Sequence, residues 1–97
     1  MQFAQIQSKF ISRLFSIMHY VYILKSITHP GKYYVGLTEN LDQRLKAHNC
    51  GETMFGKKYR PWEIETFISF KNKALASQFE RYLKVGSGHS FLKRHLI

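Results

Sequence analysis

The sequence predicts one α+β domain in which a small sheet is covered by helices. The order of its segments is the first reason, because two strand patterns, a helix pattern, a third strand pattern and two further helix patterns follow one another. Composition is the second, because 97 residues with 44% hydrophobic side chains can fill one core. Internal repeats and low-complexity segments are absent from the sequence. We expect the domain to span residues 18–97, after an extension at residues 1–17.

The first two strands are predicted at residues 20–24 and 33–37. Both runs are rich in aromatic and β-branched side chains, and residues 28–32 between them carry the proline and glycine of a turn. Successive side chains of a strand point to opposite faces. Tyr22 is therefore expected on the face opposite to its two neighbours, where its hydroxyl can reach a sheet surface.

A helix is predicted directly after the second strand. Asn40 can accept hydrogen bonds from the free amides of a new helix, and Gln43 follows three residues later, as in a capping box. Leu45 and His48 share an apolar stripe, and the pattern stops near residues 49–51. Because residues 51–61 show neither a helix period nor a strand period, we expect an exposed loop there.

The remaining segments predict a strand and two helices. Residues 62–70 alternate between apolar and polar side chains, which is typical of a strand with one packed face. Asn72 is placed to cap the next helix, which two glycines should end, and residues 90–96 form a last short helix. The apolar stripe of the Asn72 helix consists of Leu75, Phe79, Tyr82 and Leu83.

The extension at residues 1–17 has apolar side chains at steps of three or four residues, which predicts an amphipathic helix. It lacks the roughly 18 consecutive apolar residues of a membrane span, and no secretion signal is evident. Two alternatives stay open: an upstream start, with the functional chain beginning at Met18, or a membrane-surface helix that uses Lys9 and Arg13. A single cysteine, Cys50, excludes an internal disulfide and favours a cytoplasmic location.

The net charge of +9 favours a polyanionic partner, because cations that neutralise phosphates release condensed counterions. Ordinary solubility is the alternative explanation of the charge. The candidate nucleic-acid-binding residues are Lys57, Lys58, Arg60 and Lys84. The five histidines show no spacing of a zinc site, so we expect no structural metal.

Four side chains are candidates for phosphodiester chemistry. Tyr22 and Tyr34 belong to neighbouring strands, and Arg44 and His48 lie one turn apart on the helix that follows, so both can reach one phosphate. An arginine matches phosphate oxygens with a fork of donors, whereas a histidine can donate, accept or shuttle a proton near pH 7. The alternative is aromatic packing for the tyrosines and a solvated surface for the helical pair.

Glu80 is the acidic candidate, because it lies on a helix crowded with cations and is the last acidic residue of the chain. A lone carboxylate in such surroundings can be an ion-pair partner. It can equally hold a divalent cation whose other positions are filled by water and substrate phosphate, which is how Mg²⁺ is usually bound. Its own neighbourhood in the sequence leaves both roles open.

Taken in order, these residues resemble the GIY-YIG nuclease superfamily. The match consists of Tyr20-Val21-Tyr22, Tyr34-Val35-Gly36, Arg44, His48 and Glu80. The small stand-alone bacterial branch is resembled by Arg60-Pro61-Trp62 and Glu80-Arg81-Tyr82-Leu83-Lys84. The resemblance covers residues 20–96 and implies a three-stranded antiparallel sheet flanked by helices.

The resemblance also implies a role for each residue. Tyr22 would help to activate the attacking water, Tyr34 would orient water or phosphate, and which tyrosine acts as the base stays open. Arg44 would stabilise charge in the transition state, while His48 would assist proton transfer. Glu80 would hold a single Mg²⁺ or Mn²⁺ ion.

The expected function is therefore a divalent-metal-dependent endonuclease acting on DNA. The chain has no room for the separate DNA-binding domain of larger members, so we expect low sequence specificity, with structure-selective action or a protein partner as the sources of selectivity. Phe55, Tyr59 and Trp62 near the basic segment are candidates for stacking on unpaired bases. The alternative is a non-catalytic nucleic-acid-binding module of the same fold. The oligomeric state stays open.

Overall fold

The computed structural model describes residues 18–97, and the helix predicted at residues 1–17 lies outside this part of the chain. Three strands and four helices occupy the described residues. In chain order they are β1 (His19–Ser26), β2 (Tyr33–Thr38), α2 (Leu41–Asn49), α3 (Met54–Tyr59), β3 (Trp62–Phe70), α4 (Lys73–Leu83) and α5 (Gly86–His95). Among these helices, none is long and apolar enough to cross a membrane.

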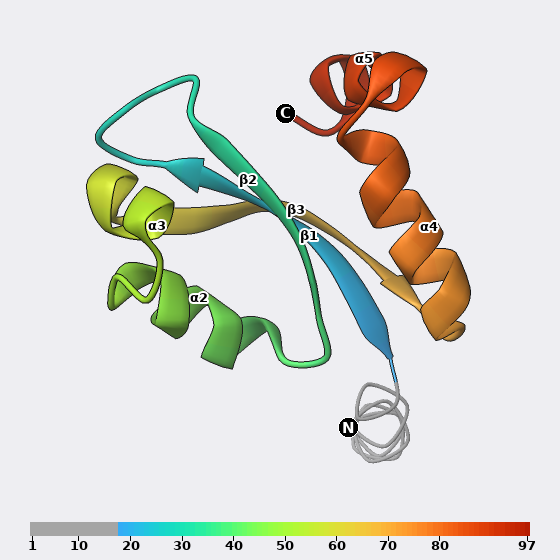
Figure 1. The fold of residues 1–97 in the computed structure, drawn as a ribbon, viewed down its shortest axis with the longest axis horizontal. Helices are drawn as coiled ribbons and strands as arrows, with labels where there is room; N and C mark the ends of the chain where they lie inside the picture. The colour runs from blue at the N-terminus through green and yellow to red at the C-terminus, as the bar shows by residue number, and fades with distance from the viewer. Residues whose placement is uncertain (1–17) are drawn as a thin grey trace, which may run out of the picture.

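The strands form one antiparallel sheet in the order β2-β1-β3, which confirms the predicted fold class. β1 is the central strand, so its backbone groups pair on both sides. Tyr22 lies opposite Gly36 on β2 and opposite Phe67 on β3. Helices α2 and α3 lie on one side of the sheet, and α4 and α5 lie on the other (Figure 1).

The alternation of β1 side chains divides the interior into two clusters. Val21 and Ile23 are fully buried against α4 and α5, where they meet Ala76, Leu83 and Leu92. The other face of the same strand holds a second cluster, formed by Tyr22, Leu24 and Trp62. Leu41 and Leu45 of α2 pack against it, which confirms the apolar stripe predicted for this helix.

Helix α2 is fixed at both of its ends. Asn40 Oδ1 accepts a hydrogen bond from the Gln43 amide at 3.1 Å, as its capping position predicts. At the other end, the Asn49 side chain accepts from the Trp62 amide at 2.5 Å and donates to the Trp62 carbonyl at 3.1 Å. These bonds join the end of α2 to the start of β3 and so set where the helix side chains lie over the sheet.

The prediction of an exposed loop at residues 51–61 is wrong, because this segment contains the six-residue helix α3. Thr53 caps this helix by accepting from the Gly56 amide at 2.9 Å. The Trp62 indole then donates to the Gly56 carbonyl at 3.0 Å, and the Phe55 ring stacks on Trp62 with centroids 5.6 Å apart. Two of these contacts come from β3, so local sequence could not indicate them.

Two details of the carboxyl-terminal helices also differ from the prediction. α5 begins at Gly86, four residues earlier than expected, because Gly86 takes a positive φ of 53° and Gly88 lets the helix approach the end of α4. A Cβ on Gly88 would lie 1.7 Å from the Tyr82 carbonyl oxygen. On α4, Leu75 is 53% exposed and Ala76 is buried in its place, so the predicted stripe is one residue out of phase there.

Candidate active site

The Tyr22 side chain is buried in the middle of the sheet and is only 1% exposed. Its ring lies over Gly36 of the edge strand β2, where a Cβ would stand 2.4 Å from the Tyr22 hydroxyl oxygen. No real side chain tolerates that distance. Gly36 therefore leaves the space into which the phenol extends.

Arg44 and His48 both bind the Tyr22 hydroxyl. They lie one turn apart on α2, whose apolar stripe packs against the same face of the sheet. Arg44 Nε donates to the hydroxyl oxygen at 3.2 Å, and His48 Nε2 lies 3.0 Å from it. Because arginine can only donate, the hydroxyl accepts from Arg44, whereas the direction of its bond with His48 depends on which ring nitrogen of the imidazole carries the proton.

Tyr34 completes an aromatic group around this bond network. Its ring centroid lies 4.4 Å from that of His48 and 6.1 Å from that of Tyr22. Unlike Tyr22, Tyr34 is half-buried. The structure thus brings four of the five residues singled out from the sequence into one cluster, in which the Arg44 and Tyr34 side chains are partly open to solvent.

Burial and charge set the protonation states of the cluster. Burial raises the pKa of Tyr22 above its ordinary value, although the Arg44 hydrogen bond acts in the opposite direction. Burial also lowers the pKa of His48, and the charge of Arg44 lowers it further. The pKa of Arg44 is raised by its bond to Tyr22. At neutral pH the cluster therefore holds a neutral phenol, a neutral imidazole and a permanent cation.

Glu80, the fifth residue, is not in contact with this cluster: no hydrogen bond between its carboxylate and the other four residues is observed in residues 18–97. It lies on α4, which packs on the opposite side of the sheet, yet its charge raises the pKa of Tyr22. Since β2 is an edge strand, groups from both sides of the sheet can meet around it. The Glu80 carboxylate forms an ion pair of 2.6 Å with Lys84 and is 17% exposed.

The described residues contain no group of three or more His, Cys, Asp and Glu side chains able to enclose a metal ion. Glu80 is thus a single-carboxylate donor close to a charged cluster. This donor set fits a Mg²⁺ or Mn²⁺ ion that takes most of its oxygens from water and phosphate. It does not fit a structural metal.

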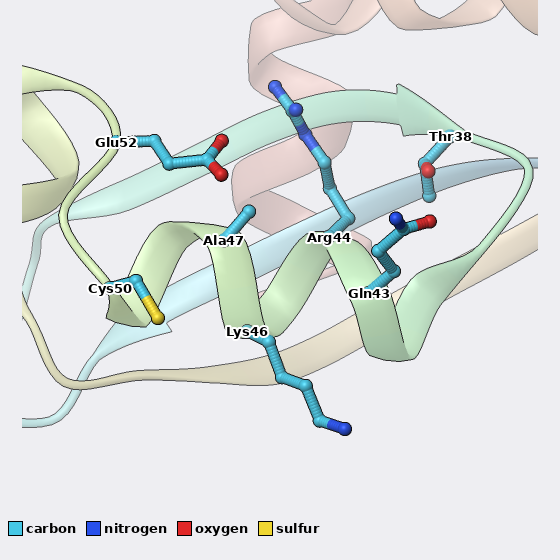
Figure 2. Close-up of a pocket in the computed structure, with 7 residues that line it drawn as sticks. All are labelled: Thr38, Gln43, Arg44, Lys46, Ala47, Cys50 and Glu52. Carbon is cyan, nitrogen blue, oxygen red and sulfur yellow. The ribbon is translucent and has the colours of Figure 1, made fainter.

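Arg44 also lines a hollow of about 470 Å³ that extends along α2 from Thr38 at the end of β2 to Glu52 (Figure 2). The Arg44 side chain rises from the helix with Glu52 to one side of it, whereas Lys46 points away. Glu52 acts on the site as well, because its charge opposes the lowering of the His48 pKa. Glu52 is not among the residues predicted from the sequence, where the one signal for it is its position four residues after His48.

The predicted nucleic-acid-binding cations lie on exposed parts of the molecule. Lys57 and Lys58 belong to α3, Arg60 follows it, and Lys84 ends α4. Their role stays a prediction. Trp62 is 2% exposed and is therefore excluded as a partner for stacking bases, whereas Phe55 is 41% exposed.

Comparison with known proteins identifies relatives of most of the described region. Residues 18–90 match the GIY-YIG catalytic domain. A UPF0213 protein of Clostridium perfringens is 42% identical over 71 aligned residues, which cover 69% of this chain and 71% of that protein. The solution structure of a UPF0213 protein from Bacillus halodurans is similar with a TM-score of 0.49 and 28% identity, over 81% of this chain and 86% of that one.

A second kind of relative is the structure-specific endonuclease subunit SLX1 of Debaryomyces hansenii. It is 37% identical over 84 aligned residues, which cover 78% of this chain. The same alignment covers 23% of that relative, so this chain spans about a quarter of its length. From the match over residues 18–90 and the identity to the Clostridium perfringens protein, this chain belongs to the GIY-YIG catalytic domain family, in its branch of small bacterial proteins.

Proposed function

We propose that this protein is a divalent-metal-dependent endonuclease that hydrolyses phosphodiester bonds in DNA with low sequence specificity. The observation that carries the proposal is the buried Tyr22 hydroxyl, held between the Arg44 guanidinium and the His48 imidazole. A polar group is costly to bury unless its hydrogen bonds are made, and packing alone would be served by phenylalanine. The SLX1 relative, which is named a structure-specific endonuclease subunit, supports the same activity.

In this mechanism Arg44 binds the scissile phosphate from the solvent side while it keeps its bond to Tyr22. Its fixed charge stabilises the negative charge that develops on the phosphate oxygens, a contribution that needs no rearrangement during the reaction. Tyr34, the more exposed phenol, orients the attacking water or the phosphate. A neutral His48 whose proton is on Nδ1 has a free lone pair on Nε2, so in this mechanism it takes the Tyr22 proton as Tyr22 accepts one from the water.

Glu80 would hold the Mg²⁺ or Mn²⁺ ion. When bound, the ion would neutralise charge on the phosphate. Lys84 pairs with one oxygen of the Glu80 carboxylate, Oε2, so an arriving cation competes with the ammonium group for this carboxylate. The metal ion and the Arg44 guanidinium would both bring positive charge to the phosphate, which suits a polyanionic substrate.

Selectivity is proposed to come from the structure of the nucleic acid or from a protein partner. The name of the SLX1 relatives, which are subunits that act on particular structures, supports this interpretation. The exposed cations of α3 would bind phosphates without reading bases. A cytoplasmic location stays a prediction.

A cleavage panel tests the function. Purified protein is incubated with duplex, flap, junction and single-stranded DNA and with RNA, in Mg²⁺, in Mn²⁺ or with a chelator. We expect strand scission that requires the metal and that Glu80→Gln abolishes. Glu65→Gln is the matched control, because it makes the same change at an exposed carboxylate of β3. Binding without scission of any substrate would favour the non-catalytic module instead.

A further inference from the structure

We propose that the pocket between the β2 edge, α3 and the start of α5 accepts one unpaired nucleobase of the bound strand. The pocket measures about 390 Å³. The residues used in this inference are Tyr34, Phe55, Leu83, Lys84, His89 and Leu92, all of which line it. The inference rests on the proposed nuclease function and names the structural feature that its substrate must have.

The pocket opens next to the candidate active site, because Tyr34 belongs to both. The Tyr34 ring lies 4.4 Å from the His48 ring and also forms a wall of the pocket. Lys84 is a second link, since it lines the pocket and pairs with Glu80. A nucleotide whose base occupied the pocket would therefore carry its phosphate toward Arg44 and Tyr22.

The aromatic wall is firmly supported from behind. Phe55 is 41% exposed, although it stacks on the buried Trp62 at 26° between planes and contacts Tyr59 at 5.0 Å between centroids. Its ring is 6.3 Å from that of Tyr34. An exposed aromatic ring fixed in this way loses little conformational freedom when a base stacks on it. Such stacking tolerates any base, because every base has a π-face.

The charge of the pocket favours a nucleotide over an apolar peptide. Leu83 and Leu92 supply an apolar floor, whereas Lys84 and His89 supply nitrogen donors beside it. A base bonded to a phosphodiester matches both features at once. The Lys84 ammonium is half-exposed, so it can reach a phosphate outside the pocket.

This assignment limits the substrates that can be cut efficiently. A base in an intact duplex is stacked and paired, and removing it from the stack costs a few kcal/mol. An unpaired base at a flap, a junction or a single-stranded end avoids that cost. The pocket would thus give structure selectivity to a chain that reads no sequence.

The test compares strands with and without bases. Affinity is measured by fluorescence anisotropy for a single-stranded oligothymidylate and for a fully abasic strand of equal length, with a chelator present so that neither is cut. Both strands offer the same phosphates. We expect the protein to bind the thymidylate about ten-fold more tightly or better, as base stacking generally contributes.

Phe55→Leu should bring this ratio close to one, because leucine keeps the apolar contact with Trp62 but has no π-face. Met54→Leu is the control, since Met54 is the neighbouring residue on α3, is 86% exposed and is not part of the pocket. A second measurement needs no variant. On addition of the oligothymidylate, the NMR methyl signals of Leu83 and Leu92 should shift, and with the abasic strand they should not.

Equal affinity for the two strands would overturn the proposal that the pocket accepts a base. So would an equal loss of affinity for both strands in Phe55→Leu. So would unchanged leucine signals. If DNA is cut with Mg²⁺ but these results are negative, only the pocket is wrong. If the ratio and the signals behave as expected but no substrate is cut, the pocket stands and the proposed endonuclease function fails.

Discussion

The two faces of the sheet share the central strand β1 but bury different kinds of atoms. On one face of β1, Val21 and Ile23 bury only carbon against α4 and α5. On the other, Tyr22 and His48 bury polar atoms beneath α2 and α3. Each of those atoms has a partner, and within residues 18–97 no buried side-chain nitrogen or oxygen lacks one.

The two faces differ in the substitutions that they tolerate. A carbon-only core accepts side chains of similar volume, and its contribution to stability depends on how well the space is filled. A buried hydrogen-bonded group needs particular atoms at particular distances, and losing one partner strands the other. We therefore expect changes on the first face to alter stability, and changes on the second to alter activity more than stability.

The largest expected effect is on the carbon-only face. Ile23→Ala should lower the free energy of unfolding by about 2–5 kcal/mol, because Ile23 is fully buried and a cavity remains. Ile23→Val should lower it by only about 0.5–1.5 kcal/mol. Urea denaturation measures both. The contrast between the faces breaks down if folded Ile23→Val protein loses most of its cleavage activity.

Arg44→Ala probes the other face. We expect cleavage to slow by about 10²–10³-fold, the usual effect of removing one donor that stabilises transition-state charge. Unfolding should change far less, since Arg44 is only partly buried. Lys46→Ala on the same helix is the control, because its side chain is exposed and points away from Arg44 (Figure 2). Equal losses in the two variants would remove Arg44 from the mechanism.

Gly36→Ala sharpens the comparison at the edge strand. The added methyl would stand 2.4 Å from the Tyr22 hydroxyl oxygen, so we expect the phenol to shift and its bonds to Arg44 and His48 to be disturbed. Overpacking of this kind costs about 1–3 kcal/mol of stability. Cleavage should fall in the variant that remains folded. Crystallography would show the displaced ring, and an undisturbed Tyr22 to His48 distance would contradict the prediction.

The smallest expected effect is on the titration of His48. The pKa of His48 lies below the ordinary value near 6.5. The neutral, proton-accepting form of His48 should therefore persist in mildly acidic solution, and cleavage activity should begin to fall only when the pH is lower than about 6.5. Glu52→Gln should lower the His48 pKa further, and Arg44→Gln should raise it. NMR titration of the His48 ring protons measures this pKa in the unmodified protein and in both variants. The reverse order of the two variants would exclude this electrostatic account.

The sequence predicted the elements whose signals are local. Asn40 and Asn72 are capping residues at their predicted positions, and each side chain accepts a hydrogen bond from the amide three residues later. The alternation at residues 62–70 predicted β3, with the even positions the less exposed. It also placed Tyr22 opposite to Val21 and Ile23, which the two clusters confirm.

The short helix α3 could not be predicted in this way, because it depends on contacts with residues that follow it. Its central Gly56 is a poor helix residue, and the Trp62 indole bonds to the Gly56 carbonyl from outside the helix. The two glycines at residues 86 and 88 likewise predict the end of α4 but lie within α5. Only the close approach of α5 to Tyr82 explains Gly88.

By itself, then, the sequence determined which side chains are candidates for the chemistry and which face of the strand Tyr22 occupies, because residue type and strand alternation are local properties. Only the tertiary structure decided that the Tyr22 phenol is buried and bonded to both Arg44 and His48, and that Glu80 acts on it from a helix across the sheet. Burial, distance and charge between segments far apart in the chain depend on how those segments pack.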